Sequence, residues 1–112
     1  MARSYIPERG DVVWLDFDPQ TGREQAGRRT AIVLSPREYN RRSGLALLCP
    51  VTSRIKNYPF EVRLPDAFDV RGVVLCDQIK SLDWAARKLA RHAQLDQNTM
   101  AQVLGKVHAL LA

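Results

Sequence analysis

The chain has few of the residues from which disulfide frameworks and metal centres are built, with two cysteines and two histidines among 112 residues. Cys49 and Cys76 each lie within an apolar stretch, which is typical of buried, reduced thiols. The sequence contains no Cys-x-x-Cys motif, no His-Glu-x-x-His motif and no His/Asp cluster, so it gives no support for a metal site or another cofactor. Any chemistry is therefore expected to rely on side chains alone.

Long hydrophobic runs are also absent. The longest apolar runs, such as residues 31–34 and 73–76, are far shorter than the roughly 18 residues that a membrane helix needs. The first residues show no apolar core followed by a cleavage site, so no secretory signal is expected. With 46% hydrophobic and 26% charged residues, the composition is typical of a folded soluble protein. We therefore expect one domain over residues 1–112, without a membrane partner and located in the cytoplasm.

Positive charge is abundant and unevenly placed. The formal net charge is +5, and residues 23–42 contain six arginines and two glutamates, a local net charge of +4. A local basic excess attracts polyanions and favours contacts with phosphate groups. The alternative is an ordinary solvated surface, and charge alone does not separate the two.

Apolar and polar residues alternate at several places in the way that predicts β-strands. Side chains at residues 11–18 point alternately to two faces and predict a strand. Residues 19–27 contain Pro19, Gly22 and Gly27 and are expected to form a loop. A short apolar run at residues 31–34 predicts a buried strand. Further strands are expected at residues 45–51, 60–64 and 72–79.

Two helices are expected. A short helical turn should begin at Ser35 and Pro36, run through Arg42 and end at Gly44. The stronger signal lies near the end of the chain, where six apolar residues recur at helical spacing: Met100, Val103, Leu104, Val107, Leu110 and Leu111. Asp96 is a natural N-cap for this helix, and Leu95 can contact Met100.

The sequence does not decide between helix and strand for residues 81–94. Helix propensity slightly favours a helix, while residues 88–93 also show the apolar and polar alternation of a strand. Five or six short strands with little helix before the end predict a small, strongly twisted β-barrel.

Six segments together resemble a known family. They are GDVVWLDFDP (10–19), GREQAGRR (22–29), IVLSP (32–36), CPVTS (49–53), YPFEV (58–62) and DQIKS (77–81). Their order and spacing are similar to those of MazF/PemK toxins over roughly the first three-quarters of the chain. The chain departs from the family pattern at Thr30, where proline is common.

The resemblance implies a mainly β fold with a C-terminal helix, the small SH3-like barrel of MazF, PemK and CcdB toxins. It also implies a homodimer that cleaves single-stranded RNA, chiefly mRNA, with sequence specificity and without a metal ion. The expected products carry 2′,3′-cyclic phosphate and 5′-hydroxyl ends, and cleavage inhibits translation and growth. A cognate, MazE-like antitoxin with an acidic, disordered tail is the expected partner. Family members usually have a turn and a strand after the DQIKS segment, so the resemblance favours a strand at residues 88–93.

Metal-independent cleavage begins when the 2′-hydroxyl attacks the adjacent phosphorus. It requires proton removal, stabilisation of the phosphorane charge and proton delivery to the leaving oxygen. The fork of Arg29 can hold two phosphate oxygens and stays charged, and the resemblance implies that Thr52 acts with it. Because an arginine with a pKa above about 12 is a poor base, Glu24 is the candidate that accepts the 2′-hydroxyl proton. Which group serves as base and which as acid stays open.

Each of these assignments has a plainer alternative. Arg29 could contact solvent or Asp16, and Thr52 could satisfy a neighbouring carbonyl as an ordinary strand residue. Glu24 could be a solvated carboxylate paired with a nearby arginine. His92 and His108 lie outside the matching segments and are expected to be structural.

Substrate contacts are expected from aromatic, amide, hydroxyl and basic side chains, since single-stranded bases stack on aromatic rings and phosphates pair with Lys and Arg. These residues are Phe17, Gln25, Arg28, Ser53, Arg54, Lys56, Gln78 and Lys80. Phe17 also has a core interpretation, because it shares a strand face with Val13 and Leu15.

Two other functions remain to be tested against the ribonuclease. One is a toxin of the CcdB type that binds DNA gyrase without cutting, although such toxins act through a C-terminal segment with a Trp near its end, which this chain lacks. The other is a basic RNA-binding module without catalysis. The resemblance to ACA-cutting members makes ACA the first guess for the cleavage sequence.

Overall fold

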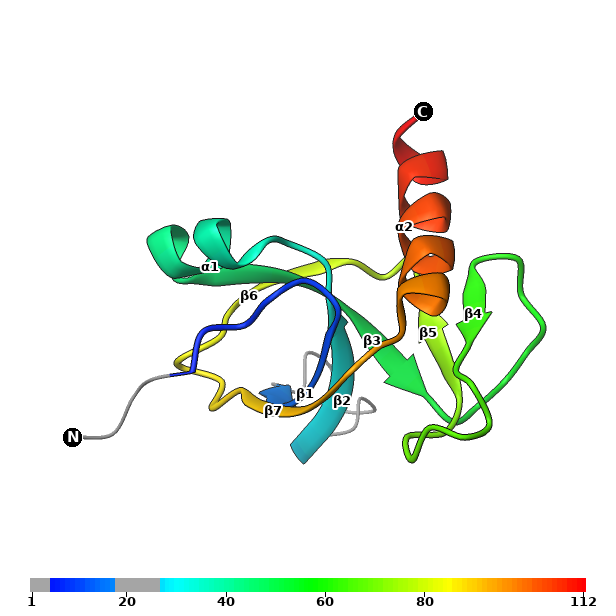
Figure 1. The fold of residues 1–112 in the computed structure, drawn as a ribbon, viewed down its shortest axis with the longest axis horizontal. Helices are drawn as coiled ribbons and strands as arrows, with labels where there is room; N and C mark the ends of the chain where they lie inside the picture. Colours follow the sequence, from blue (N-terminus) through cyan, green and yellow to red (C-terminus); the bar gives the residue numbers. More distant parts are fainter. Residues whose placement is uncertain (1–4, 18–26) are drawn as a thin grey trace.

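A computed structural model describes residues 5–17 and 27–112 of the chain. Within these ranges the chain forms seven strands and two helices (Figure 1). In chain order they are β1 (Asp11–Phe17), β2 (Gly27–Val33), α1 (Arg37–Ser43), β3 (Leu45–Thr52), β4 (Glu61–Arg63), β5 (Val73–Leu75), β6 (Lys80–Asp83), β7 (Ala90–Gln94) and α2 (Gln97–Leu111).

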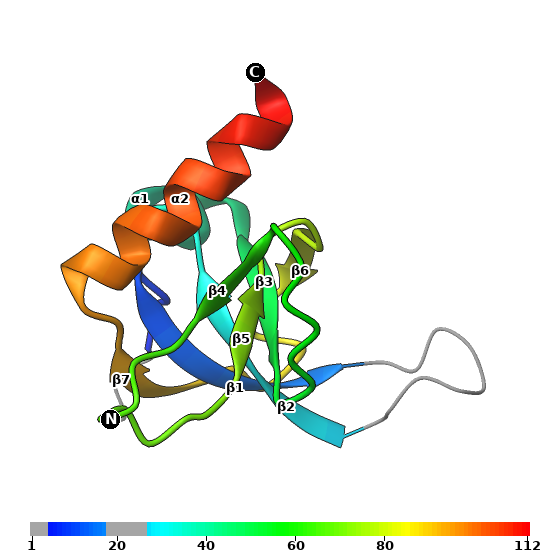
Figure 2. The same ribbon diagram turned by 90° about the vertical axis from the view of Figure 1, so that its right-hand side faces the viewer.

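The strands form one curled antiparallel sheet with the order β4-β5-β3-β2-β1-β7. Strand β6 also pairs with β3, along Leu45 to Leu48, whereas β5 pairs with the end of β3 at Val51 and Thr52. The sheet wraps around its core without closing, because β4 and β7 are the two ends of this order (Figure 2). The mainly β architecture with a C-terminal helix is therefore confirmed, with the barrel partly open.

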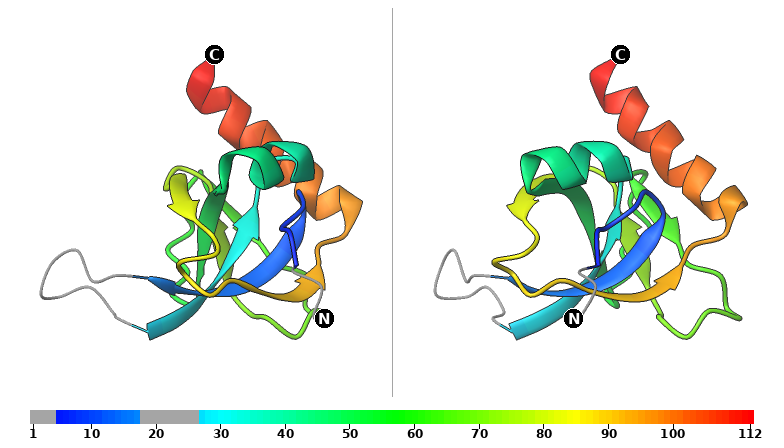
Figure 3. Two further views of the ribbon diagram at one scale, coloured as in Figure 1. Left: turned by 90° about the vertical axis from the view of Figure 1, so that its left-hand side faces the viewer. Right: turned by 60° about the vertical axis from the view of Figure 1, so that its left-hand side comes forward.

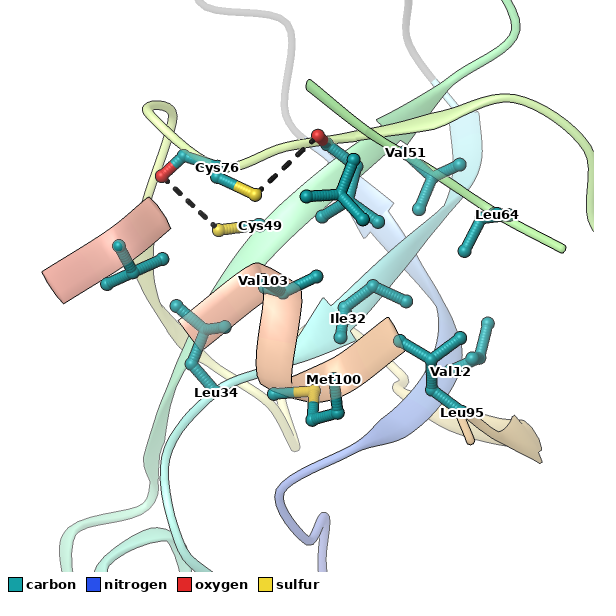
Figure 4. Close-up of a cluster of buried hydrophobic side chains, with 13 residues drawn as sticks. Val12, Ile32, Leu34, Cys49, Val51, Leu64, Cys76, Leu95, Met100 and Val103 are labelled. Atoms are coloured by element: carbon teal, nitrogen blue, oxygen red, sulfur yellow. Dashed lines mark hydrogen bonds between the residues drawn. The ribbon is translucent and has the colours of Figure 1, made fainter. Parts of the chain in front are cut away.

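Both faces of the central strands are buried. On one face, residues such as Val12, Ile32 and Cys49 pack against Met100 and Val103 of α2 (Figure 4). The other face forms a second cluster that includes Val13, Leu15, Ala31, Val33, Ala46 and Leu48. Alternation along β2 and β3 thus divides their apolar side chains between two cores. Helix α1 lies alongside β3 at one end of the curled sheet (Figure 3).

Helix α2 begins at the expected cap. The Asp96 side chain accepts a hydrogen bond from the Thr99 amide at 2.9 Å, and Met100, Val103 and Val107 are buried. The helical spacing predicts that the whole apolar stripe packs on the sheet, and this is wrong for its last two residues, because Leu110 and Leu111 are 41% and 77% exposed. The last turn extends past the sheet that the earlier turns cover (Figure 2).

Several strands and helices begin or end at other residues than predicted. Residues 72–79 were expected to form one strand, but a turn in which the Gln78 amide donates to the Leu75 carbonyl separates β5 from β6. Ser35 was expected as the N-cap of α1 and Pro36 as its first residue, but Pro36 is the N-cap and the helix begins at Arg37. The Ser35 hydroxyl donates to the Asn40 side chain and does not cap the helix. Gly44 ends α1 with a φ of 74°, as expected.

The region after β6 follows the resemblance rather than helical propensity. Strand β7 spans Ala90–Gln94 and pairs with β1, and the residues before it form turns. The expected strand at residues 88–93 is therefore confirmed, shifted by about two residues, which is an ordinary uncertainty for a strand boundary.

Cys49 and Cys76 are free and buried, as predicted (Figure 4). The Cys49 thiol lies 3.9 Å from the Cys76 carbonyl oxygen. Burial raises the pKa of Cys49 to about 12 and the pKa of Cys76 to about 11. In the described ranges, no helix is both long and apolar enough to cross a membrane.

Candidate nucleic-acid interface

A surface cavity of about 310 Å³ lies where β3, β4 and β5 meet the loop after β3. We call it the Thr52 cleft. It is lined by Thr52, Arg54, Lys56, Tyr58, Glu61, Leu75, Asp77 and Gln78. Four of the residues predicted to bind or cleave RNA, from two distant parts of the sequence, thus meet in one cavity: Thr52, Arg54, Lys56 and Gln78.

Both signs of charge occur in the Thr52 cleft. Arg54 and Lys56 are exposed cations, while Glu61 and Asp77 contribute carboxylates. The Tyr58 hydroxyl donates to Asp77, and this hydrogen bond raises the pKa of Tyr58. Such a lining offers cations for phosphates, and an aromatic ring with acceptors for base edges.

Tyr58, Glu61 and Asp77 are the polar cleft residues that the sequence interpretation missed. All three lie inside segments quoted for the family resemblance, YPFEV and DQIKS, so a signal for them was present. Glu61 also shapes the loop, because both of its carboxylate oxygens accept from the Lys56 amide, at 3.3 and 3.2 Å.

Thr52 is the last residue of β3 and is half-buried. Its hydroxyl oxygen accepts a hydrogen bond from the Arg54 amide at 3.2 Å. On the other side, Thr52 pairs with Val73 at the start of β5. These contacts place the hydroxyl at the end of a buried strand, with its own hydrogen still available to a ligand oxygen.

Arg29 lies on the neighbouring strand at the same end of the sheet. Strands β2 and β3 are paired as far as Ala31 and Pro50, and continuing this register for two residues would place Arg29 opposite Thr52. Residues directly opposite in an antiparallel pair project to the same side. No partner for the Arg29 guanidinium occurs among residues 5–17 and 27–112, and Arg29 itself does not line the Thr52 cleft.

Arg28, by contrast, is heavily engaged. Its guanidinium donates to Asp16 at 3.1 Å and to the carbonyl oxygens of Trp14 at 3.2 Å and Lys88 at 2.7 Å. It is therefore Arg28 that pairs with Asp16, and its guanidinium ties β1 and β2 to the turn before β7.

The remaining predicted residues do not line the Thr52 cleft or lie outside the described residues. Ser53 is exposed beside Thr52, and Lys80 is exposed at the start of β6, outside the lining of the Thr52 cleft. Phe17 ends β1 opposite Gly27. The predictions for the Phe17 side chain, for Glu24 and for Gln25 fall outside the described residues.

The histidines lie apart from the cleft lining. His92 on β7 pairs with Asp69 at 3.0 Å, and His108 is exposed on α2. Among the described residues, no group of three or more His, Cys, Asp or Glu side chains could hold a metal ion.

Sequence comparisons with known proteins match the chain to a toxin family. Residues 8–111 match the family model described as PemK-like, MazF-like toxin of type II toxin-antitoxin system. The chain is 41% identical over 111 residues to the endoribonuclease toxin MazF of Escherichia coli, covering 99% of each chain. It is 33% identical over 104 residues to the endoribonuclease EndoA of Bacillus subtilis, covering 88% of each.

Solved structures with a similar fold are also MazF proteins. The crystal structure of MazF (Form-I) from Deinococcus radiodurans matches with a TM-score of 0.88 and 52% identity, covering 96% of this chain and 98% of that one. A MazE-MazF structure (Form-II) from the same organism matches with a TM-score of 0.89 and 52% identity, covering 96% and 97%. The chain therefore belongs to the PemK-like, MazF-like toxin family of type II toxin-antitoxin systems.

Proposed function

We propose that this protein is an endoribonuclease toxin that cleaves single-stranded RNA, chiefly mRNA, at specific sequences without a metal ion. The observation that carries the proposal is the Thr52 cleft, where Thr52, Arg54, Lys56 and Gln78 meet at the end of the sheet that also holds Arg29. Relatives that are 41% and 33% identical to this chain are named endoribonucleases. Cleavage of mRNA inhibits translation and growth.

In the proposed reaction the 2′-oxygen attacks the adjacent phosphorus, and the bond from phosphorus to the 5′-oxygen breaks. The products are a 2′,3′-cyclic phosphate and a 5′-hydroxyl. The Arg29 guanidinium donates two hydrogen bonds to the non-bridging oxygens as negative charge builds on them, and the Thr52 hydroxyl donates to one of them. One proton leaves the 2′-hydroxyl and one reaches the leaving 5′-oxygen. Glu24 is our candidate for the first transfer.

Recognition of the RNA is divided between phosphates and bases. Arg54 and Lys56 in the cleft hold backbone phosphates, while Gln78 reads a base edge. The other proposed contacts are Phe17, Gln25, Arg28, Ser53 and Lys80. ACA is the first sequence to test.

The proposed partner is a MazE-like antitoxin with an acidic, disordered tail. A solved relative is described as a MazE-MazF structure, and the cleft cations Arg54 and Lys56 suit an acidic segment. The protein acts in the cytoplasm as a homodimer. RNA and the antitoxin tail are expected to compete for one surface, and simultaneous binding at the same protomer would contradict this.

The experiment is incubation of the purified protein with a long unstructured RNA in excess EDTA, followed by sequencing of the cleavage ends. Discrete cuts with cyclic-phosphate ends support the proposal. Binding without cuts would indicate a non-catalytic RNA-binding module, and inhibition of gyrase without RNA cuts would indicate a toxin of the CcdB type.

A matched substrate tests the chemistry. An oligonucleotide with a single 2′-deoxy sugar at the cut site keeps every phosphate and base but lacks the attacking hydroxyl. We expect binding without cleavage. Cutting of this oligonucleotide at the normal rate would rule out 2′-hydroxyl attack.

A further inference from the structure

Gly72, the residue directly before β5, lies against the end of β3. Gly72 has a φ of 122°, a conformation that residues with a side chain rarely adopt. A β-carbon at this position would overlap the Thr52 carbonyl oxygen, and would lie 2.8 Å from the Thr52 carbonyl carbon and 3.0 Å from the Ser53 Cα. All three are backbone atoms, so no side-chain rotation can relieve the overlap. Only a glycine allows β5 and the Thr52 backbone to approach this closely.

The Gly72 side of this contact is firmly held. The Gly72 carbonyl accepts from the Leu64 amide at 3.0 Å, and Val73 and Val74 pair with Thr52 and Val51. Leu64, Val73 and Val74 are all buried. On the other side, β3 ends at Thr52 and the next residues are exposed. An added group at residue 72 would therefore force residue 72 and the Thr52–Ser53 backbone apart, which changes the position of Thr52 relative to β5.

We propose that Gly72 is a positioning residue for RNA cleavage, because its missing side chain sets where the Thr52 hydroxyl meets the scissile phosphate. This role rests on the proposed function of Thr52. A shift of about 1 Å in a catalytic group is sufficient to slow a reaction by about 100-fold. Gly72 itself touches no substrate and acts through Thr52 alone.

The first test is Gly72→Ala, assayed by single-turnover cleavage and by RNA binding. We expect the cleavage rate constant to fall by about 100-fold while the Kd for RNA changes by less than about threefold, because Arg54 and Lys56 still hold the phosphates. A normal cleavage rate, or a loss confined to binding, would overturn the proposal.

The chain offers two matched controls. Gly10 and Gly44 also have positive φ, 93° and 74°, but a β-carbon at either would meet nothing within 4 Å. Gly10→Ala and Gly44→Ala thus also place a side chain on a residue with positive φ, but without touching Thr52. Both should cleave within about threefold of the wild-type rate, since strain alone lowers stability rather than the rate of the folded enzyme. A 100-fold loss in either control would show that strain, and not the Thr52 contact, is responsible.

A double-mutant cycle tests whether Gly72 acts through Thr52. Thr52→Val removes the hydroxyl with little change of shape, and the variant carrying both Gly72→Ala and Thr52→Val should cleave at the rate of Thr52→Val alone. Losses that multiply would refute the positioning role while leaving the ribonuclease intact. A wild-type protein that cuts no RNA would instead refute the proposed function, and this role with it.

Urea unfolding measures whether each variant is folded and how stable it is. Should Gly72→Ala not fold, Val73→Ala provides the alternative, because it removes a neighbouring side chain while keeping the glycine and its contact. We expect its cleavage rate within about threefold of wild type. A loss as large as that of Thr52→Val in a folded Val73→Ala protein would contradict a specific role for Gly72.

Discussion

The Nε2 atom of His92 lies 3.0 Å from both carboxylate oxygens of Asp69, and the pair joins β7 to the loop between β4 and β5. Because β4 and β7 are the two ends of the sheet order, this hydrogen-bonded pair spans the side on which the strand pairing does not close. Trp14 meets the His92 ring edge-on, with 6.2 Å between ring centroids. The surroundings of His92 are those of a structural residue.

Asp69→Asn and His92→Gln should each leave RNA cleavage unchanged. Asp69 is 71% exposed, so loss of the pair should lower the free energy of unfolding by no more than about 1 kcal/mol. Urea unfolding and single-turnover cleavage measure the two effects. A stable His92→Gln protein that no longer cuts RNA would place His92 in the chemistry and contradict the structural assignment.

The buried thiols predict a loss of stability at alkaline pH. The pKa values of Cys49 and Cys76 rise from an ordinary value of 9.0 to about 12 and about 11 in the folded protein. The folded state therefore keeps protons that the unfolded state releases, and the free energy of unfolding should fall as the pH rises above about 9. Between pH 8 and pH 10, the variant carrying Cys49→Ala and Cys76→Ala should show a shallower decline. Equal slopes would show that the thiols do not contribute.

The cap of α2 predicts an acid-dependent contribution to stability. Hydrogen bonds from the side chain and amide of Thr99 hold the pKa of Asp96 below its usual value. The unfolded state therefore binds a proton more readily, so the stabilisation is present above the ordinary pKa of Asp96 and is lost as the pH falls through the lowered value.

Two substitutions separate the cap from its charge. Asp96→Ala should lower the Tm by about 4 °C at neutral pH. Asp96→Asn should keep most of the cap but show a weaker dependence on acid pH. Thermal melts from pH 7 to pH 3 measure both, and an unchanged Tm for Asp96→Ala would contradict the capping role.

Local sequence patterns predicted most of the secondary structure but not where it stops. The alternation at residues 11–18 and the helical spacing from Met100 to Val107 correspond to β1 and α2, because burial of one face imposes that period. Leu110 and Leu111 continue the same period yet are exposed, since the sheet ends before they do. The break between β5 and β6 has no glycine or proline to mark it, and depends on the path of β3.

Candidate site residues came from the family resemblance, and their arrangement came only from the fold. Arg28 and Arg29 are neighbours in one basic segment, and charge alone does not distinguish them. The structure separates their surroundings, because Arg28 pairs with Asp16, whereas Arg29 would fall opposite Thr52 if the β2–β3 register continued past Ala31 and Pro50. Gly72 belongs to none of the matching segments, and only its close approach to Thr52 reveals it.

The two arginines also allow the central claim to be tested with a matched pair of variants, Arg29→Ala and Arg28→Ala. The measurement is single-turnover cleavage of an RNA oligonucleotide in excess EDTA, with urea unfolding on the same samples. Arg29→Ala should fold normally and cleave about 100-fold to 1,000-fold more slowly, because it removes a charged donor from the phosphorane.

Arg28→Ala should instead lose about 1 kcal/mol of unfolding free energy, because its bonds to Asp16, Trp14 and Lys88 are structural. With RNA at saturating concentration, its folded fraction should retain most of the single-turnover cleavage rate, because Arg28 is a proposed RNA contact that does not reach the phosphorane, so its loss should raise the Kd for RNA instead. A folded Arg29→Ala protein that cuts RNA at a near-normal rate would contradict the account, because metal-free stabilisation of the phosphorane would then have to come from another residue.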